Sequence, residues 1–298
     1  MSFRSAILGI AAQEDINFLL TNRIPRLALT RFMGWLSKVE NPVVAKASIA
    51  LWRFFCDVDL TDSRQSHFPS LRQAFIRELR EGARAVDADP DALVSPCDAI
   101  VGAFGRVSAG QALQIKGFPY AIADLLGEEE AVREFEGGWF VTLRLTAGMY
   151  HRFHAPHDLT VETVRYISGD TWNVNPIALK RIERLFCKNE RAPITAHLDA
   201  GGERIMLVPV AAVLVASIRL PFLDEANNVR NGGERVRACS AHFAKGDEMG
   251  WFEHGSTIVV LAPSTWKPEA LEEGRQLQMG SPLLTKASPA HGTSRPFA

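Results

Sequence analysis

The chain has 298 residues, of which 47% are hydrophobic and 22% are charged, and its formal net charge is −1 at pH 7. This length allows one large domain or a domain with an appendage, and the composition is ordinary for a folded globular protein. The near balance of charges argues against general electrostatic attraction to nucleic acid, so we expect no nucleic-acid partner.

The four cysteines, none in a CxxC spacing, favour neither a structural zinc site nor a disulfide framework. We therefore expect a reducing compartment and no bound metal. Residues 1–13 lack the basic-then-apolar layout of a secretory signal, and no apolar run is long enough to predict a helix that crosses a bilayer. The sequence thus predicts a soluble or peripheral protein.

The first part of the chain is predicted to be helical. Apolar residues recur at three- and four-residue steps from about Glu14 to Cys56, with a second run over Val43–Phe55, and the spacing predicts another helix over Ser70–Glu81. Basic residues flank the apolar face of the first region: Arg23, Arg26, Arg31 and Lys38. The bulky apolar residues of this region are Phe32, Trp35, Leu36, Trp52 and Phe54.

After Asp87 the pattern changes to short runs rich in β-branched residues, separated by Gly, Pro and Asp, which predicts strands. The predicted strands are Ala99–Val101, Trp139–Leu145, Leu159–Ile167, Ile205–Ile218 and Thr257–Leu261. Short helices are expected at Ala121–Leu126 and Pro176–Leu185, and disorder from Thr285 onward. The expected fold class is α+β, with an N-terminal helical layer on a β-rich, barrel-like or sandwich-like catalytic core.

Three short segments supply the side chains of an activated nucleophile. Ser95–Asp98 has a carboxylate, Tyr150–His154 has two imidazoles, and His254–Thr257 has hydroxyls. A serine hydroxyl needs an imidazole to take its proton, and the imidazole works best when a carboxylate fixes its tautomer. Taken singly, each has an ordinary explanation: Asp98 could make a turn before a strand, and the histidines could be simple core or surface residues.

Residues 249–263 read MGWFEHGSTIVVLAP, and this stretch resembles the self-processing segment of the phosphatidylserine decarboxylases, which carries Gly-Ser-Thr on a strand leading to a proline. Tyr150–Pro156 closely matches the Tyr-His-Arg-x-His-x-Pro of the same family. The resemblance continues, in the right order, from about Ile24 to Pro263. Its other matching segments are Val94–Val101, Gln114–Gly117, Tyr166–Asn175 and Leu185–Arg191.

The resemblance implies a role for each matched residue. Ser256 is the nucleophile that cleaves the Gly255–Ser256 bond and becomes a covalent pyruvoyl group, which is the only cofactor implied. His154 matches the base for this cleavage and Asp98 the carboxylate that orients it. His151 matches the histidine of the decarboxylation step. The products would be a β chain of residues 1–255 and an α chain of residues 256–298.

The implied activity is that of a carboxy-lyase of phospholipid biosynthesis, which converts phosphatidylserine to phosphatidylethanolamine through a Schiff base with the pyruvoyl group. Two alternatives stay open. One is a pyruvoyl-dependent decarboxylase of a free amino acid or another amino lipid, and the other is a binding protein on the same scaffold that never processes.

The resemblance also implies a peripheral protein on the cytoplasmic side of an anionic membrane. Residues 1–60 would form the membrane-associating helical segment and residues 61–298 the catalytic domain. The two chains would form a heterodimer that dimerises further. His254, where the family usually has leucine, and the polar stretch 217–240 depart from the family pattern.

Overall fold

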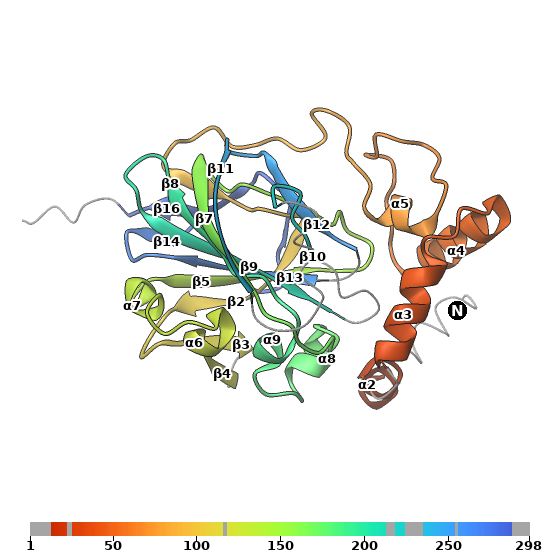
Figure 1. Ribbon diagram of the computed structural model, residues 1–298, viewed down its shortest axis with the longest axis horizontal. Helices are drawn as coiled ribbons and strands as arrows, with labels where there is room; N and C mark the ends of the chain where they lie inside the picture. Colours follow the sequence, from red (N-terminus) through yellow and green to blue (C-terminus); the bar gives the residue numbers. More distant parts are fainter. Residues whose placement is uncertain are drawn as a thin grey trace, which may run out of the picture.

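The computed structural model describes residues 13–22, 26–115, 118–212, 218–223, 235–253 and 256–287 (Figure 1). Helices of the N-terminal region line one side of a β-rich body, and a small helix lies between them and the sheet in Figure 1. The predicted α+β class is confirmed.

The N-terminal region forms the predicted helices. They are α2 (Glu14–Asn22), α3 (Arg26–Leu36) and α4 (Pro42–Phe55). Asn41 caps α4, since its side chain accepts hydrogen bonds from the backbone N–H groups of Val43 and Val44, and Pro42 occupies the first helical turn. None of the described helices has the length and apolar character needed to traverse a bilayer.

The helix predicted over Ser70–Glu81 is much shorter than expected. Ser70 caps α5 (Leu71–Phe75), which ends after five residues. The backbone beyond it pairs with an earlier segment instead: Arg64 N donates to the Glu78 carbonyl, and Arg80 N donates to the Asp62 carbonyl. These long-range hydrogen bonds outweigh the local helical periodicity.

The body is built on an eight-stranded sheet in which all strand pairs are antiparallel. Within the described residues this sheet is open, with β11 and β15 at its edges, and forms no closed barrel. Its strands, in spatial order, are β11 (Arg235–Phe243), β7 (Leu159–Tyr166), β8 (Ile194–Leu198), β9 (Arg204–Ala211), β13 (Ser256–Ala262), β5 (Trp139–Leu145), β2 (Ala99–Arg106) and β15 (Gln276–Leu277).

Smaller elements cover this sheet. Three smaller sheets comprise β1 (Ala92–Val94), β16 (Pro282–Lys286) and β14 (Trp266–Pro268); β10 (Ile218–Arg219), β12 (Glu248–Phe252) and β6 (Arg152–His154); and β3 (Gln111–Ile115) with β4 (Phe118–Ala121). The short helices are α6 (Ile122–Leu126), α7 (Val132–Phe135), α8 (Pro176–Leu179) and α9 (Leu185–Lys188).

The prediction of disorder from Thr285 onward was wrong for its first two residues. Thr285 and Lys286, expected to be disordered, pair in β16 with β1 and β14. Residues 288–298 lie outside the described part of the chain.

The central strand β13 is buried on both faces, because a hydrophobic cluster packs on each side of the sheet. All seven of its residues are buried. Ile258, Val260 and Ala262 belong to one cluster, and Val259 and Leu261 belong to the other. This division follows from the two-residue period of a strand. The strand that begins with Ser256 therefore lies inside the sheet, covered on both faces by apolar side chains.

Candidate active site

The strand register brings the predicted site segments to one end of the large sheet. Ser256, the first residue of β13, lies opposite Leu145, the last residue of β5. Ile100 at the start of β2 pairs with Arg144 on the other side of β5. Asp98 immediately precedes β2, so it and Ser256 flank the same strand end, separated by two strand spacings of roughly 10 Å in total. An imidazole side chain fits between groups at that separation.

The hydroxyl of Ser256 is buried and forms no hydrogen bond within the described part of the chain. The residue is fully buried, and its Oγ has no partner among the described residues. A buried hydroxyl without a partner costs about 1–3 kcal/mol, which makes such an atom a candidate for chemistry. The two preceding residues, His254 and Gly255, lie outside the described residues.

His154, on β6, is held by its backbone and by both ring nitrogens. Its backbone N–H donates to the Pro96 carbonyl over 2.8 Å, which brings the segment before Asp98 beside it. Nδ1 lies 2.9 Å from the Gly246 carbonyl oxygen, and Nε2 lies 3.0 Å from the Tyr150 hydroxyl. Because a carbonyl only accepts, Nδ1 carries the proton of the neutral ring and Nε2 presents its lone pair.

Asp98 binds an arginine. Its two oxygens accept from Arg84, with Nη2 at 2.6 Å and Nε at 2.9 and 3.2 Å, and Oδ1 also accepts from the Met279 backbone N–H. Both charged side chains are only 9% exposed. Removing one partner of a buried ion pair leaves an uncompensated charge and costs about 3–5 kcal/mol, so Arg84 fixes the place of this carboxylate.

The resemblance implies that Asp98 orients His154 and that His154 activates Ser256, but the structure shows neither hydrogen bond among the described residues. Among the described residues, none joins Asp98 to His154 or His154 to Ser256, and the acceptor on His154 Nδ1 is the Gly246 carbonyl. Asp98 still acts at a distance. Burial lowers the pKa of His154 below its ordinary value of 6.5, and the charge of Asp98 partly opposes this shift.

His151 lies between the sheet end and helix α5. Its ring packs on Phe75 at a centroid distance of 4.0 Å, and Phe75 packs in turn on Trp52 of α4. Nδ1 lies 2.8 Å from the Met149 carbonyl oxygen, so this nitrogen also carries the proton in the neutral ring. The His151 carbonyl accepts from Phe252 N–H, four residues before Ser256. His151 is thus fully buried and tied to the strand that leads into the Gly255–Ser256 bond.

A metal centre finds no support within the part of the chain that the structure describes, since no three His, Cys, Asp or Glu side chains gather there with the geometry of a metal site. The chemistry available at the end of the sheet is that of a hydroxyl, two imidazoles, a phenol and a carboxylate.

Comparison with known proteins shows the family to which the chain belongs. The family model described as phosphatidylserine decarboxylase matches residues 71–285. The chain belongs to the phosphatidylserine decarboxylase family. It is 35% identical over 264 residues to the phosphatidylserine decarboxylase proenzyme of Myxococcus xanthus, covering 86% of this chain and 93% of that protein. It is 31% identical over 275 residues to that of Brevibacillus brevis, covering 90% and 96%.

Tyr150 and Arg84 contact the predicted site of this phosphatidylserine decarboxylase family member, but neither residue was identified from the sequence. Tyr150 stands in the Tyr-His-Arg motif, and its position four residues before His154 was the available signal. Burial raises the pKa of its hydroxyl above the usual 10, so the phenol stays protonated and donates to His154. Arg84 carried no signal, because it lies in a loop 14 residues from Asp98 and follows no periodicity.

Proposed function

We propose that this chain is a phosphatidylserine decarboxylase proenzyme that cleaves its own Gly255–Ser256 bond. The observation that carries the proposal is the buried Ser256 hydroxyl, which has no hydrogen-bond partner among the described residues and stands at the sheet end near Asp98, His151 and His154. The family's match over residues 71–285 supports the same conclusion. We propose that the substrate is phosphatidylserine and that the products are CO₂ and phosphatidylethanolamine.

Self-cleavage uses only groups of the chain. Once the Tyr150 hydroxyl releases its hydrogen bond to His154 Nε2, this nitrogen takes the hydroxyl proton of Ser256 while Oγ attacks the Gly255 carbonyl carbon. The proton then goes to the departing Ser256 nitrogen, which leaves an ester. Removal of the Ser256 Cα proton breaks the Cβ–Oγ bond and releases the Gly255 carboxylate. Water then hydrolyses the resulting imine to a ketone and ammonia. The chain of residues 256–298 begins with this pyruvoyl group.

The residues present fit such a group, since the orphaned Ser256 Oγ is the atom that the reaction removes. When formed, the pyruvoyl group supplies an electron sink for the loss of CO₂. His151 then supplies the proton: its Nε2 lone pair, set by the Nδ1–Met149 hydrogen bond, takes up a proton from water and delivers it to the carbon that loses CO₂. Arg84 keeps the carboxylate of Asp98 in place beside His154.

The substrate is tested by measuring CO₂ release from vesicles that contain phosphatidylserine, beside soluble serine and tryptophan at the same concentration. We expect release from the vesicles only. If CO₂ were released from a soluble amino acid and not from the vesicles, the substrate would be a free amino acid and not the lipid.

We further propose that α2, α3 and α4 bind the membrane surface. Bulky apolar side chains on them are exposed: Leu19, Phe32, Trp35, Val43, Leu51 and Phe55. Phe32 and Trp35 form a pair with ring centroids 6.0 Å apart. Trp52, in contrast, turns toward the body, where its Nε1 donates to the Ala147 carbonyl. Lys38 is exposed, whereas Arg23 and the side chains of Arg26 and Arg31 lie outside the described residues.

Replacing Phe32 and Trp35 together by serine is expected to weaken vesicle binding. Each large side chain that enters the interface contributes on the order of 1.5 kcal/mol, so the double variant should bind roughly 100-fold more weakly. Vesicle co-sedimentation measures this, with the exposed apolar Val236→Ser on β11 as the control, which should bind like the wild type. If the double variant bound vesicles as tightly as the wild type, α3 would not be part of the membrane-binding surface. Binding should also weaken with salt.

The pH dependence of self-cleavage follows from His154. Its neutral ring is the base, and burial lowers its pKa below 6.5, so the base form persists under mildly acidic conditions. We expect the cleavage rate to stay level down to pH 6.5 and to fall, about tenfold per pH unit, only below that value. Rates of chain cleavage in buffers of constant ionic strength measure this. A half-maximal rate above pH 6.5 would contradict the assignment of His154 as the buried base.

A further inference from the structure

Glu253 stands three residues before Ser256 and is held by two arginines. Its Oε1 accepts from Arg72 Nη2 at 2.7 Å, from Arg72 Nε at 3.1 Å and from Arg219 Nε at 3.2 Å. The Glu253 side chain is 7% exposed, and those of Arg72 and Arg219 are 25% and 29% exposed. Although burial opposes it, the pKa of the Glu253 carboxyl is lowered, because the two arginines outweigh desolvation.

The two arginines come from elements on different sides of this carboxylate. Arg72 belongs to α5, whose Phe75 packs on His151. Arg219 belongs to β10, which pairs with β12 so that Arg219 lies opposite Trp251 and Ile218 opposite Phe252. Glu253 is therefore fixed relative to both the helix at the site and the strand that leads into the cleavage segment.

On the far side of the scissile bond, Ser256 is equally fixed, since β13 pairs with β5 and β9 from its first residue. Only residues 254 and 255 connect these two anchored ends. Attack of a hydroxyl on a neighbouring carbonyl depends steeply on the separation and alignment of the two groups, and a small misplacement slows such a reaction about 100-fold. A buried ion pair is a weak stabilising device, because desolvation offsets its attraction, but its geometry is well defined.

We propose that Arg72 and Arg219, acting through Glu253, position the Gly255–Ser256 peptide bond for self-cleavage. The three are positioning residues and exchange no proton or bond with the reacting groups. The inference rests on the proposed self-processing and names residues for it beyond the hydroxyl and its base. Once the bond is cut, Glu253 no longer constrains Ser256 through the chain, so the cluster serves processing more than decarboxylation.

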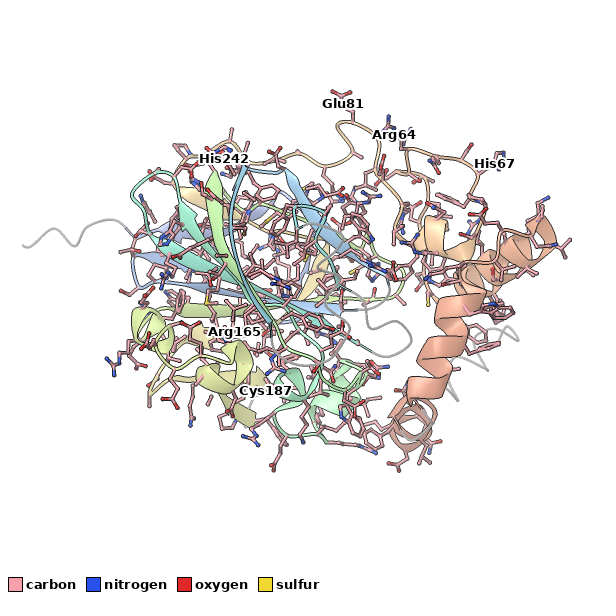
Figure 2. All side chains as sticks on the ribbon, in the orientation of Figure 1. Arg64, His67, Glu81, Arg165, Cys187 and His242 are labelled. Atoms are coloured by element: carbon pink, nitrogen blue, oxygen red, sulfur yellow. The ribbon has the colours of Figure 1, made fainter. Side chains whose placement is uncertain are left out.

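The test follows chain cleavage over time after synthesis of the full chain in a cell-free system. We expect Glu253→Gln and Arg219→Met to cleave at least tenfold more slowly than the wild type, a loss of about 1.4 kcal/mol. The fraction that does cleave should decarboxylate at a rate close to the wild type's per pyruvoyl group. Arg64→Met is the matched control, because Arg64 forms an exposed ion pair with Glu78 and lies on the outer loop in Figure 2.

Hydroxylamine, which cleaves esters, separates the steps. If the cluster positions the first attack, Glu253→Gln accumulates little of the ester between Gly255 and Ser256. Hydroxylamine then does not restore fast cleavage of the chain. If Glu253→Gln does not fold, Arg72→Lys provides the test, because lysine keeps the charge but loses the fork of two N–H donors and should also cleave slowly.

Three results would overturn the inference. If Glu253→Gln cleaved at the wild-type rate, the positioning role of the cluster would be wrong, while the proposed function would still hold. An equal loss of processing and of decarboxylation per pyruvoyl group would assign the cluster a general structural role. A wild-type chain that never cleaves would overturn the proposed function and, with it, this inference.

Discussion

Replacing Ser256 with alanine is expected to leave an uncut chain of 298 residues without decarboxylase activity. Alanine has no oxygen to attack the Gly255 carbonyl and none to eliminate, so neither the cleavage nor the ketone can form. The substitution removes one buried hydroxyl that no described residue hydrogen-bonds, so the fold should be preserved or slightly stabilised. Denaturing electrophoresis and CO₂ release measure the two losses.

The control is Ser240→Ala, which removes an exposed serine from edge strand β11. This variant should cleave and decarboxylate like the wild type. Cleavage of Ser256→Ala into two chains would show that another residue is the nucleophile.

The second large effect separates the two histidines. His154→Gln should slow self-cleavage about 100-fold to 10,000-fold, the usual contribution of a positioned base. His151→Gln should cleave at a rate close to the wild type's but lose decarboxylation by about 100-fold or more, because the proton carrier at the reacting carbon is missing. Cleavage time courses and CO₂ release per pyruvoyl group, measured on the same preparations, distinguish these outcomes.

Thermal unfolding serves as the control for both variants, since both histidines are buried and hydrogen-bonded. The assignment of roles would be contradicted if His151→Gln failed to cleave while His154→Gln cleaved normally.

Much of the fold could be predicted because its signals are local. The strands predicted from Ala99, Trp139, Leu159 and Thr257 stand in the sequence as short β-branched runs between turn residues, and the structure begins these strands at Ala99, Trp139, Leu159 and Ser256. The length of α5 could not be predicted, since it is limited by hydrogen bonds between residues 62–64 and 78–80 that no local pattern announces. The open sheet likewise depends on pairings between distant segments.

The residue types of the candidate site could be proposed from the sequence, but the contacts of these residues could not. Ser256, His154 and Asp98 carry the residue types that an activated hydroxyl needs. Their hydrogen bonds depend on partners brought by tertiary structure: Arg84 on Asp98, and Gly246 and Tyr150 on His154.

This arrangement suggests how Asp98 contributes. A carboxylate already paired with arginine stabilises a protonated His154 less than a free one would. We therefore expect Asp98 to contribute through its charge at a distance, while the Gly246 carbonyl sets the tautomer of His154.

The intact mass of the purified wild-type protein tests the central claim most directly. The account predicts two chains, residues 1–255 and residues 256–298, and the second should be lighter by one ammonia than a chain that begins with serine. A single species with the mass of all 298 residues, its Ser256 unmodified, would contradict it.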